Sequence, residues 1–343
     1  MQEEAHVTQR TAPGVVRVWR GDVIESRHRV HVAVVGADGS LRCFAGDPSL
    51  VVFARSAVKL VQAIPLLEDG VAEAFGFTIP ELALCCASHS GEPMHVELAA
   101  SMLRKIGAGE ESLACGPHAP YYEGAADALR AEGREPGRLH NNCSGKHAGM
   151  LALARHHGWP LAGYHELDHP VQQRMLAEIA RWGGISERAI ATAVDGCAVV
   201  TFGLSVEVLA RTFARFATAA RRNNGMAARV VQAMVQNPAV VAGTNRLCTA
   251  LVEATHGRIF AKVGAEGVYC AGVPGAELGI ALKVEDGAGR AAETALLAVL
   301  HQLGVLSSEE LGGLQQWVTP QIRNTRGERV GYIDASIELE GGV

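Results

Sequence analysis

The sequence has no apolar run of about 18 residues, the length that a membrane-spanning helix needs. It has no long basic stretch either, and Arg221-Arg222 is too short to indicate nucleic-acid binding. Residues 1–6 are polar and acidic, unlike a secretory signal peptide. From these absences we expect a cytoplasmic protein that binds neither a membrane nor a nucleic acid.

The eight cysteines have no regular spacing, so the chain does not resemble a small secreted protein held together by disulfides. In a reducing compartment their thiols stay free to bind metal. The 343 residues are 48% apolar and carry a net charge of -5. This is enough apolar sequence to bury a large core, as one large domain or as two closely packed ones.

Predicted strands gather at both ends of the chain, and predicted helices lie in its middle. Asp38-Gly39 is a hairpin turn signal. The expected strands span residues 30–35, 41–44, 258–262, 268–272 and 278–284, with a last one near 330–333. We therefore expect a single domain of the α+β class, with a mostly antiparallel sheet flanked by helices. Its sheet lobe would comprise about 1–55 and 257–343, and its large helical lobe about 56–256.

Two segments have the apolar periodicity of buried helices. One follows Ser205 and the other spans residues 288–302, and Asn223-Asn224-Gly225 is expected to form a turn between two helices. The predicted core positions are Val206, Leu209, Phe213 and Phe216 in the first helix, and Leu296, Leu297 and Leu300 in the second.

Ser56-Ala57-Val58-Lys59 is the first motif that carries chemistry. A serine and a lysine three residues apart share one face of a helix, with Cβ atoms about 5–6 Å apart. The lysine amine can then accept the proton of the hydroxyl. Residues 50–54 are typical of a buried strand and an apolar helix follows, so we expect Lys59 to be buried with a lowered pKa. The alternative is a helix-capping Ser56 with a solvated Lys59.

Two further segments could supply a second serine hydroxyl and a second lysine amine. Lys262-Val263-Gly264 is close to the Lys-Thr-Gly box of penicillin-recognising enzymes, with valine in place of threonine. Its glycine lets a substrate approach the strand closely. Ser88 lies in a loop of small and polar residues before a helix expected to begin near Pro93. The alternatives are structural roles for an edge-strand Lys262, a helix-capping Ser90 and a buried His89.

A third cluster combines thiols with other metal ligands. Cys143-Ser144-Gly145-Lys146-His147 lies far along the chain from Asp195-Gly196-Cys197. Two thiolates with a carboxylate or an imidazole suit tetrahedral zinc. Spacing leaves three alternatives open. They are a Cys143–Cys197 disulfide, which a reducing compartment disfavours, two inert buried thiols, and a Cys143–His147 nucleophile pair.

Taken in order, five segments resemble the class 3, rhizobial-type L-asparaginase family over nearly the whole chain. They are residues 55–59 (RSAVK), 87–92 (ASHSGE), 141–147 (NNCSGKH), 194–197 (VDGC) and 261–267 (AKVGAEG). The resemblance implies a fold similar to that of the serine β-lactamases and glutaminases. It also implies a homodimer that hydrolyses L-asparagine to L-aspartate and ammonia.

The same resemblance implies which residues form the site. The catalytic residues would be two Ser-Lys pairs, Ser56 with Lys59 and Ser88 with Lys262. A zinc ion would be held by Cys143, Lys146, Asp195 and Cys197. The residues expected to contact substrate are Arg55, His89, Asn142, Gly264 and Glu266. We favour Ser56 as the acylated serine and Ser88 as a relay. Arg55 would hold the substrate carboxylate, with a structural salt bridge as the alternative.

Two other functions stay open on the sequence alone. The same fold and motifs would serve a glutaminase or a β-lactam hydrolase. Glutamine differs from asparagine by one methylene, which a pocket discriminates by only about 1–3 kcal/mol. A non-catalytic protein that binds zinc or an amino acid would also keep the fold. The presence of both serines and both lysines favours the enzyme.

Overall fold

The computed structural model describes residues 10–342, which form two compact units. The first unit comprises residues 10–52, 204–217 and 264–342, and the second comprises 53–203 and 218–263. Each unit is thus assembled from segments that are distant in sequence. The expected helical lobe included residues 204–217, which belong to the first unit in the structure.

The first unit contains a sheet in which all the residue-by-residue pairings are antiparallel. Its strands follow the order β10 (Gln321–Arg323), β11 (Arg329–Ser336), β1 (Gly14–Arg20), β2 (Val23–Val35), β9 (Leu278–Val284) and β8 (Val268–Val273). In addition, β3 (Leu41–Ala45) pairs with β2, and β12 (Glu340–Gly341) pairs with β3. The sheet therefore joins the two ends of the chain.

The hairpin between β2 and β3 shows how the local sequence builds this sheet. The last four residues of β2, Val32-Ala33-Val34-Val35, are 0% exposed. At the turn, the N–H of Ser40 donates to Asp38 Oδ1 over 3.0 Å. Gly39 has φ 80°, a conformation that L side chains rarely adopt. Asp38-Gly39 therefore forms the predicted hairpin turn.

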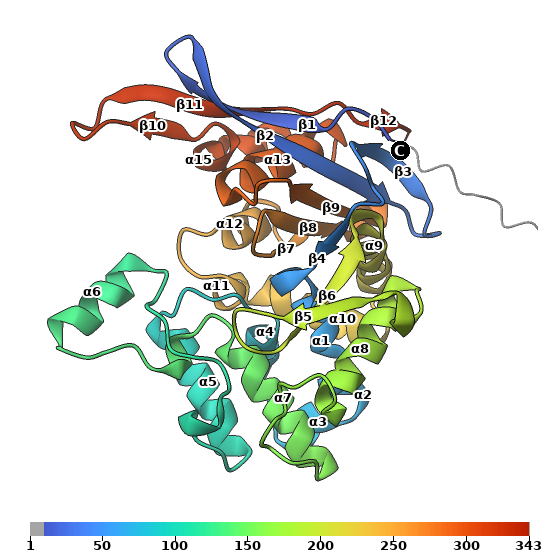
Figure 1. Ribbon diagram of the computed structural model, residues 1–343, viewed down its shortest axis with the longest axis vertical. Coiled ribbons are helices and arrows are strands. Elements are labelled where there is room, and N and C mark those ends of the chain that lie inside the picture. The colour runs from blue at the N-terminus through green and yellow to red at the C-terminus, as the bar shows by residue number, and fades with distance from the viewer. Residues whose placement is uncertain (1–9, 343) are drawn as a thin grey trace, which may run out of the picture. The chain divides into compact units, whose positions relative to one another are not determined.

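Helices cover the sheet of the first unit. α13 (Gly289–Gln302) contacts β8, β9 and β11, and Figure 1 shows it with α15 (Gln315–Val318) on one side of the sheet. α9 (Val206–Arg222) begins in this unit and crosses β9 at Gly279, where a Cβ would overlap the backbone of Ala210 and Phe213. Glycine is needed there because the helix and the strand touch backbone to backbone. α14 (Ser308–Gly312) and the short 3-10 helix η5 (Pro274–Ala276) complete the unit.

The second unit is mainly helical. Its small sheet has the order β4 (Val51–Phe53), β6 (Val200–Ser205) and β5 (Ala191–Val194), and β7 (Phe260–Val263) contacts the 3-10 helix η1 (Arg55–Val58). The α-helices are α1 (Lys59–Gln62), α2 (Ile64–Glu68), α3 (Val71–Ala74), α4 (Ile79–Cys85), α5 (Pro93–Lys105), α6 (Glu123–Ala131), α7 (Ser144–His157), α8 (Pro170–Gly183), α10 (Gly225–Gln236), α11 (Pro238–Val241) and α12 (Leu247–Ala254). Three more 3-10 helices are η2 (Glu110–Ser112), η3 (Arg138–His140) and η4 (Glu187–Ala189).

Within the second unit, α6 stands apart from the other helices (Figure 1). Leu129 is its one buried residue. The hydrophobic contact that holds α6 is therefore small.

The structure confirms the predicted fold class, a mixture of helices and antiparallel sheet. The helices expected after Ser205 and over 288–302 form, and their predicted core positions are at most 1% exposed. Strands β5 and β6 were missed within the region expected to be helical. Every residue of β5 is exposed, so no buried face marks it as a strand. β6 does alternate apolar with polar or small residues, but it is short and runs directly into the apolar stripe of the helix after Ser205.

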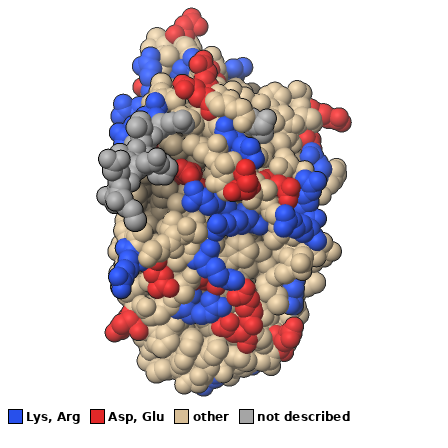
Figure 2. Space-filling view, turned by 90° about the vertical axis from the view of Figure 1, so that its right-hand side faces the viewer, with Lys and Arg blue, Asp and Glu red and all other residues tan. Residues whose placement is uncertain are grey.

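Within the described part of the chain, no helix combines the length and the apolar character needed to cross a membrane. On the face shown in Figure 2, Lys and Arg side chains are interspersed with Asp and Glu. That face therefore presents no extended basic surface of the kind that binds nucleic acid.

Candidate active site

Three buried side chains converge in the second unit. The Ser88 hydroxyl oxygen lies 2.8 Å from Lys262 Nζ and 3.2 Å from Lys59 Nζ. Ser88 is 5% exposed, and each lysine is 1% exposed. One hydroxyl thus lies between two amines that are distant in sequence. In this arrangement a proton can pass from the oxygen to a nitrogen.

A different element delivers each of these side chains. Lys59 opens α1 directly after η1, Lys262 lies in β7, and Ser88 follows α4. The backbone N–H of Ser88 donates to the carbonyl of Val241 in α11 over 3.0 Å. The loop that carries Ser88 is therefore anchored to α4 along the chain and to α11 across it.

Gly145 allows α7 to begin beside this loop. A Cβ at Gly145 would overlap the carbonyl oxygen of Leu84 in α4. Because that contact is with backbone, any larger residue would have to push the two helices apart. The close packing brings Asn142 and Cys143, which precede α7, to Lys59. Lys59 Nζ lies 3.1 Å from Cys143 Sγ and 3.4 Å from the Asn142 carbonyl oxygen.

The electrostatics of the site favour a neutral amine at Lys262. Burial, together with the charge of nearby Lys59, lowers the pKa of Lys262 to about 7. Among the described residues, the polar contacts of the two lysines are carbonyl oxygens, the Ser88 hydroxyl and the Cys143 thiol, with no carboxylate. The nearby Cys248 and Cys143 thiols oppose the lowering of the Lys262 pKa only in part. A lysine with this pKa can act as a general base near neutral pH.

Ser56 lies one helical turn before Lys59, whose backbone N–H bonds the Ser56 carbonyl oxygen. The Ser56 side chain is half-buried and makes no hydrogen bond with any described residue. The structure therefore brings Lys59 and Lys262 together at Ser88, while the Ser56 hydroxyl is nearby in sequence but not bonded to an amine.

Arg55 is turned toward Asp195. Its Nε and one terminal nitrogen both lie 2.8 Å from Asp195 Oδ1. Burial raises the pKa of Asp195, but the charge of Lys146 and the bond from Arg55 outweigh burial and hold this pKa below its usual value. Arg55 also has φ 49°, a strained conformation for a residue with a Cβ. In this structure its guanidinium thus forms the salt bridge that was the alternative, and a contact with a substrate carboxylate stays a prediction.

A cluster of thiols and amines adjoins the Ser-Lys group. Lys146 Nζ lies 3.0 Å from Cys197 Sγ. A hydrogen bond from Cys143 and the charge of Lys146 outweigh burial and lower the pKa of Cys197 well below its usual value. Cys143 and Lys146 are thus both placed to donate to the Cys197 sulfur, which favours its thiolate form. None of the cysteines forms a disulfide in the described chain, and His147 Nδ1 bonds the Tyr164 hydroxyl over 2.5 Å rather than Cys143.

By chemical type, part of this donor set suits zinc. Thiolates and a carboxylate are common zinc ligands, and the Lys146 amine would be an unusual fourth one. Among the described residues, however, no three His, Cys, Asp or Glu side chains are grouped to hold a metal, so Cys143, Asp195 and Cys197 do not form a ready metal site in this structure. A metal would have to draw these side chains together and would need Lys146 as a further ligand. Burial lowers the pKa of Lys146, but negative charge on the nearby Cys197 and Cys143 sulfurs outweighs this and raises it. A metal would therefore have to displace a proton from that amine.

The other residues expected to contact substrate have varied surroundings. His89 is 0% exposed, and burial lowers its pKa well below the usual value. Its Nδ1 accepts from the Gly91 N–H, so its Nε2 carries the proton and donates to Ser144 Oγ over 2.9 Å. Both ring nitrogens are thus used within the protein. Gly264 and Glu266 lie in the first unit, where Glu266 is exposed.

Sequence reasoning missed three residues beside this site: His118, Tyr121 and Arg246. His118 Nε2 accepts from the Asn142 N–H over 2.8 Å, and Asn142 Nδ2 lies 3.3 Å from the Tyr121 hydroxyl. The guanidinium carbon of Arg246 lies 5.9 Å from the centre of the Tyr121 ring. None of the three belongs to a recognisable motif. The available signal was an aromatic pair, Tyr121-Tyr122, in a loop rich in glycine and proline.

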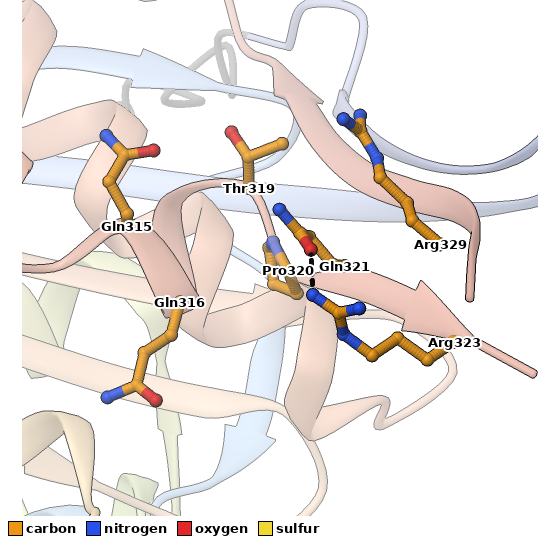
Figure 3. Close-up of a pocket in the computed structure, with 7 residues that line it drawn as sticks. All are labelled: Gln315, Gln316, Thr319, Pro320, Gln321, Arg323 and Arg329. Carbon is orange, nitrogen blue, oxygen red and sulfur yellow. Dashed lines mark hydrogen bonds between the residues drawn. The ribbon is translucent and has the colours of Figure 1, made fainter. Parts of the chain in front are cut away.

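A separate hollow of about 610 Å³ lies on the first unit (Figure 3). Its lining residues are Gln315, Gln316, Thr319, Pro320, Gln321, Arg323 and Arg329. Arg323 donates to Gln321 Oε1 over 2.7 Å. The lining contains no hydroxyl paired with an amine or another base. Size alone therefore does not make this hollow the catalytic site.

Comparison with known proteins gives one family for this chain. The sequence profile of the family described as L-asparaginase II matches residues 16–335. No curated protein sequence matches the chain. Among solved structures, a β-lactamase from Mycobacterium bovis has 16% sequence identity and a TM-score of 0.43, with 81% of this chain and 95% of that chain covered. A protein named Mglu has 17% identity and a TM-score of 0.36 over 81% and 67% of the two chains. Simvastatin synthase from Aspergillus terreus has 11% identity and a TM-score of 0.28 over 80% and 88%.

Proposed function

This chain belongs to the L-asparaginase II family, and from that premise we propose that it hydrolyses L-asparagine to L-aspartate and ammonia through a Ser-Lys acyl-enzyme. The observation that carries the mechanism is the Ser88 hydroxyl, which lies 2.8 Å from Lys262 Nζ and 3.2 Å from Lys59 Nζ. A serine hydroxyl is a weak nucleophile without an adjacent base. Lys262, with a pKa of about 7, is such a base.

The proposed reaction is acyl transfer in two halves. The serine oxygen attacks the side-chain amide carbon of asparagine, and the serine proton moves to the neutral Lys262 amine. The C–N bond then breaks, and the protonated Lys262 returns the proton to the leaving nitrogen, which departs as ammonia. Water attacks the resulting ester with the amine again acting as base, and aspartate and the free serine are released.

Different observations favour the two serines as the acylated residue. Ser88 is bonded directly to the base, but it is 5% exposed. Ser56 is half-buried and so more open to substrate, and it lies one turn before Lys59. For Ser56 to attack, its hydroxyl must contact Lys59 once substrate is bound, and Ser88 would then relay the proton to Lys262. Both routes end with the proton on Lys262.

Two alanine variants separate these routes. Incubation with a slowly hydrolysed amide, followed by mass spectrometry of peptides, shows which serine carries the acyl group. We expect Ser88→Ala to lower kcat by about a thousandfold or more, the scale seen when a member of a hydrolytic triad is removed. Ser56→Ala has the same effect if Ser56 is acylated. If it leaves ammonia release unchanged, Ser56 has no part in the chemistry.

We also propose that Cys143, Lys146, Asp195 and Cys197 hold a zinc ion beside this site. The ion would supply a fixed positive charge that neutralises the thiolates and orders the surrounding pocket. The Ser-Lys chemistry does not require it. We therefore expect its removal to raise KM more than it lowers kcat.

The assay that tests the function measures ammonia release from asparagine, glutamine and a β-lactam. Release mainly from asparagine supports the proposal. Release mainly from glutamine or hydrolysis of the β-lactam would reassign the substrate on the same site. If no amide is cleaved but the amino acid binds, the protein is a binder and the proposal is wrong.

The family resemblance also leads us to propose a homodimer in the cytoplasm. Light scattering would then give twice the 36.1 kDa mass of the chain. Fractionation of cells that express the protein at its native level would place it with the cytoplasmic enzymes.

A further inference from the structure

Arg246 lies beside the candidate active site and has no acidic partner in the part of the chain that the structure describes. It is half-buried at the residue before α12. Among the described residues, its one specific contact is with the Tyr121 ring, 5.9 Å from the guanidinium carbon to the ring centre. Its charge helps to lower the pKa of Lys262, after the effects of burial and Lys59, so its guanidinium lies within electrostatic range of that amine.

Tyr121 connects this arginine to the Ser-Lys group. Its hydroxyl lies 3.3 Å from Asn142 Nδ2, and its ring stacks on His118 with centres 5.0 Å apart. The Asn142 carbonyl oxygen in turn lies 3.4 Å from Lys59 Nζ. A short chain of contacts therefore runs from Arg246 through Tyr121 and Asn142 to the catalytic amines.

The loop that carries Arg246 is fixed to the loop that carries Ser88. Both carboxylate oxygens of Glu92 accept bonds from Thr244, one from its N–H and one from its hydroxyl, each over 2.8 Å. The Ser90 hydroxyl donates to the Ala242 carbonyl over 2.8 Å. Gly243 has φ 112°, and a Cβ there would overlap Ser90 and Glu92. These bonds set the position of Arg246 relative to Ser88.

Free asparagine is a zwitterion, so its α-carboxylate needs a cationic partner when it leaves water. Arg55 does not have its fork free, because Asp195 Oδ1 occupies two of its nitrogens. Arg246 offers an unoccupied guanidinium fork, whose planar geometry matches a carboxylate. Its half-exposed position lets a ligand reach it from solvent.

We propose that Arg246, supported by Tyr121, binds the α-carboxylate of the substrate and so restricts the enzyme to free amino acids. This inference rests on the proposed amidohydrolase function. An asparagine residue inside a peptide has no free α-carboxylate, so its binding would leave the Arg246 guanidinium without an anionic partner. The pair thus acts as a specificity determinant that recognises a group several bonds away from the amide that is cleaved.

The experiment compares L-asparagine with its α-methyl ester, which keeps the side-chain amide and removes the negative charge. In the natural protein we expect kcat/KM for asparagine to exceed that for the ester. In Arg246→Gln, we expect kcat/KM for asparagine to fall about 10- to 100-fold, the scale of one lost bond between charged groups, with the loss mainly in KM. The value for the ester should change less than threefold. Tyr121→Ala should also lower the ratio of kcat/KM for asparagine to kcat/KM for the ester.

Arg104→Gln is the matched control, because Arg104 is an exposed arginine of the same unit on α5. It should leave kcat/KM unchanged for both asparagine and the ester. Thermal unfolding of each variant shows whether the fold is kept. If Arg246→Gln lowers kcat/KM equally for asparagine and for the ester, or for neither, Arg246 does not bind the carboxylate. If the natural protein cleaves neither asparagine nor its ester, the proposed function itself has failed.

Discussion

Lys262 reaches Ser88 with a single hydrogen bond of 2.8 Å, and its burial sets the pH at which it can act as a base. An exposed lysine is protonated at neutral pH and has no lone pair to accept a proton. The fully buried position in β7, next to a second lysine, changes this. The local environment, rather than the residue type, therefore makes Lys262 suitable for catalysis.

A pH profile tests this assignment. The base must be neutral to accept a proton, and Lys262 is neutral above its pKa of about 7. We expect kcat/KM to be low in acid, to rise through about pH 7 and to level off above it. Initial rates of ammonia release in overlapping buffers provide the measurement. A profile that is flat between pH 5 and 9 would show that Lys262 is not the base.

The arginine at position 246 shows what a search for motifs overlooks. Ser-x-x-Lys and Lys-x-Gly have fixed spacing, so residues 56, 59 and 262 stand out in the sequence. Arg246 and Tyr121 are far apart along the chain, and only the packing of their loops brings them together. No spacing rule identifies such a pair. The recognition of the amide chemistry was thus accessible from the sequence, whereas the recognition of the rest of the substrate was not.

At the scale of the elements, α4 decides where Ser88 lies. Its N-terminus is closed by a capping box in which Thr78 and Glu81 bond each other's backbone N–H groups. Glu81 is 1% exposed, lies 2.6 Å from Lys105 Nζ and accepts from the Ser101 hydroxyl over 2.8 Å. These bonds tie α4 to α5, the helices on either side of the Ser88 loop.

Replacing Glu81 by alanine should therefore weaken the support of the loop. The carboxylate loses the bonds that it accepts from the Thr78 N–H and the Thr78 hydroxyl, and its ion pair with Lys105 is removed. We expect a loss of about 2–4 kcal/mol in the free energy of unfolding, measured by urea denaturation. Glu97→Ala, on the exposed side of α5, is the control and should change it by less than about 0.5 kcal/mol. Equal effects of the two variants would contradict a structural role for Glu81.

The same carboxylate contributes to the pH dependence of stability. Burial opposes ionisation, but the bonds from Lys105, Thr78 and Ser101 lower the pKa of Glu81 below its usual value. A lowered pKa in the folded state means that the contribution is present above the ordinary pKa of a glutamate. It is lost as the pH falls through the folded value. Glu81→Gln should therefore show a smaller loss of stability in acid than the natural protein.

Gly145 provides a second test at this scale. A methyl group there meets the backbone of Leu84, which cannot move without shifting α4. We expect Gly145→Ala to cost roughly 1–3 kcal/mol of stability and to lower ammonia release, because the loop that carries Ser88 follows directly after α4. Gly149→Ala, one turn later, meets only the ends of the Leu66 and Cys85 side chains and should be milder. Urea denaturation of both variants gives the comparison.

Sequence periodicity predicted the elements with strong apolar patterns and missed those without them. The stripe of Val206, Leu209 and Phe213 identified α9, and Asp38-Gly39 identified the β2–β3 hairpin. By contrast, every residue of β5 is exposed, so the strand has no buried face that could produce an apolar pattern in the sequence. The site was predictable where motifs recur in the family. The partners of Lys59 at Ala87, Asn142 and Cys143 depend on tertiary packing, which no local pattern encodes.

At the scale of the whole molecule, the second unit brings together segments that are far apart in the chain. Cys143 and Lys146 belong to the start of α7, whereas Asp195 and Cys197 lie between β5 and β6. In the structure, Lys146 holds Cys197 over 3.0 Å. An ion bound by these four residues would cross-link the two segments.

Metal removal should therefore affect the stability of the fold as well as the site. We expect about one zinc per chain by elemental analysis. Treatment with a chelator should lower Tm, because a ligand that binds only the folded state stabilises it. Re-addition of zinc should restore the Tm, and Cys197→Ser should abolish the difference. Identical melting curves with and without the chelator would show that these residues do not hold a metal.

The isolated position of α6 has a practical consequence. Leu129 is the one buried residue of this helix, and the start of the helix is held by the Tyr122 N–H, which donates to the Ser90 carbonyl over 3.1 Å. We therefore expect residues 123–136 to open more readily than α7. The backbone amides of α6 should be among the first in the second unit to exchange with deuterium, while those of α7 exchange slowly. The same segment is a suitable place to insert a tag or a fluorescent reporter, because an added peptide there would leave the core of the unit intact.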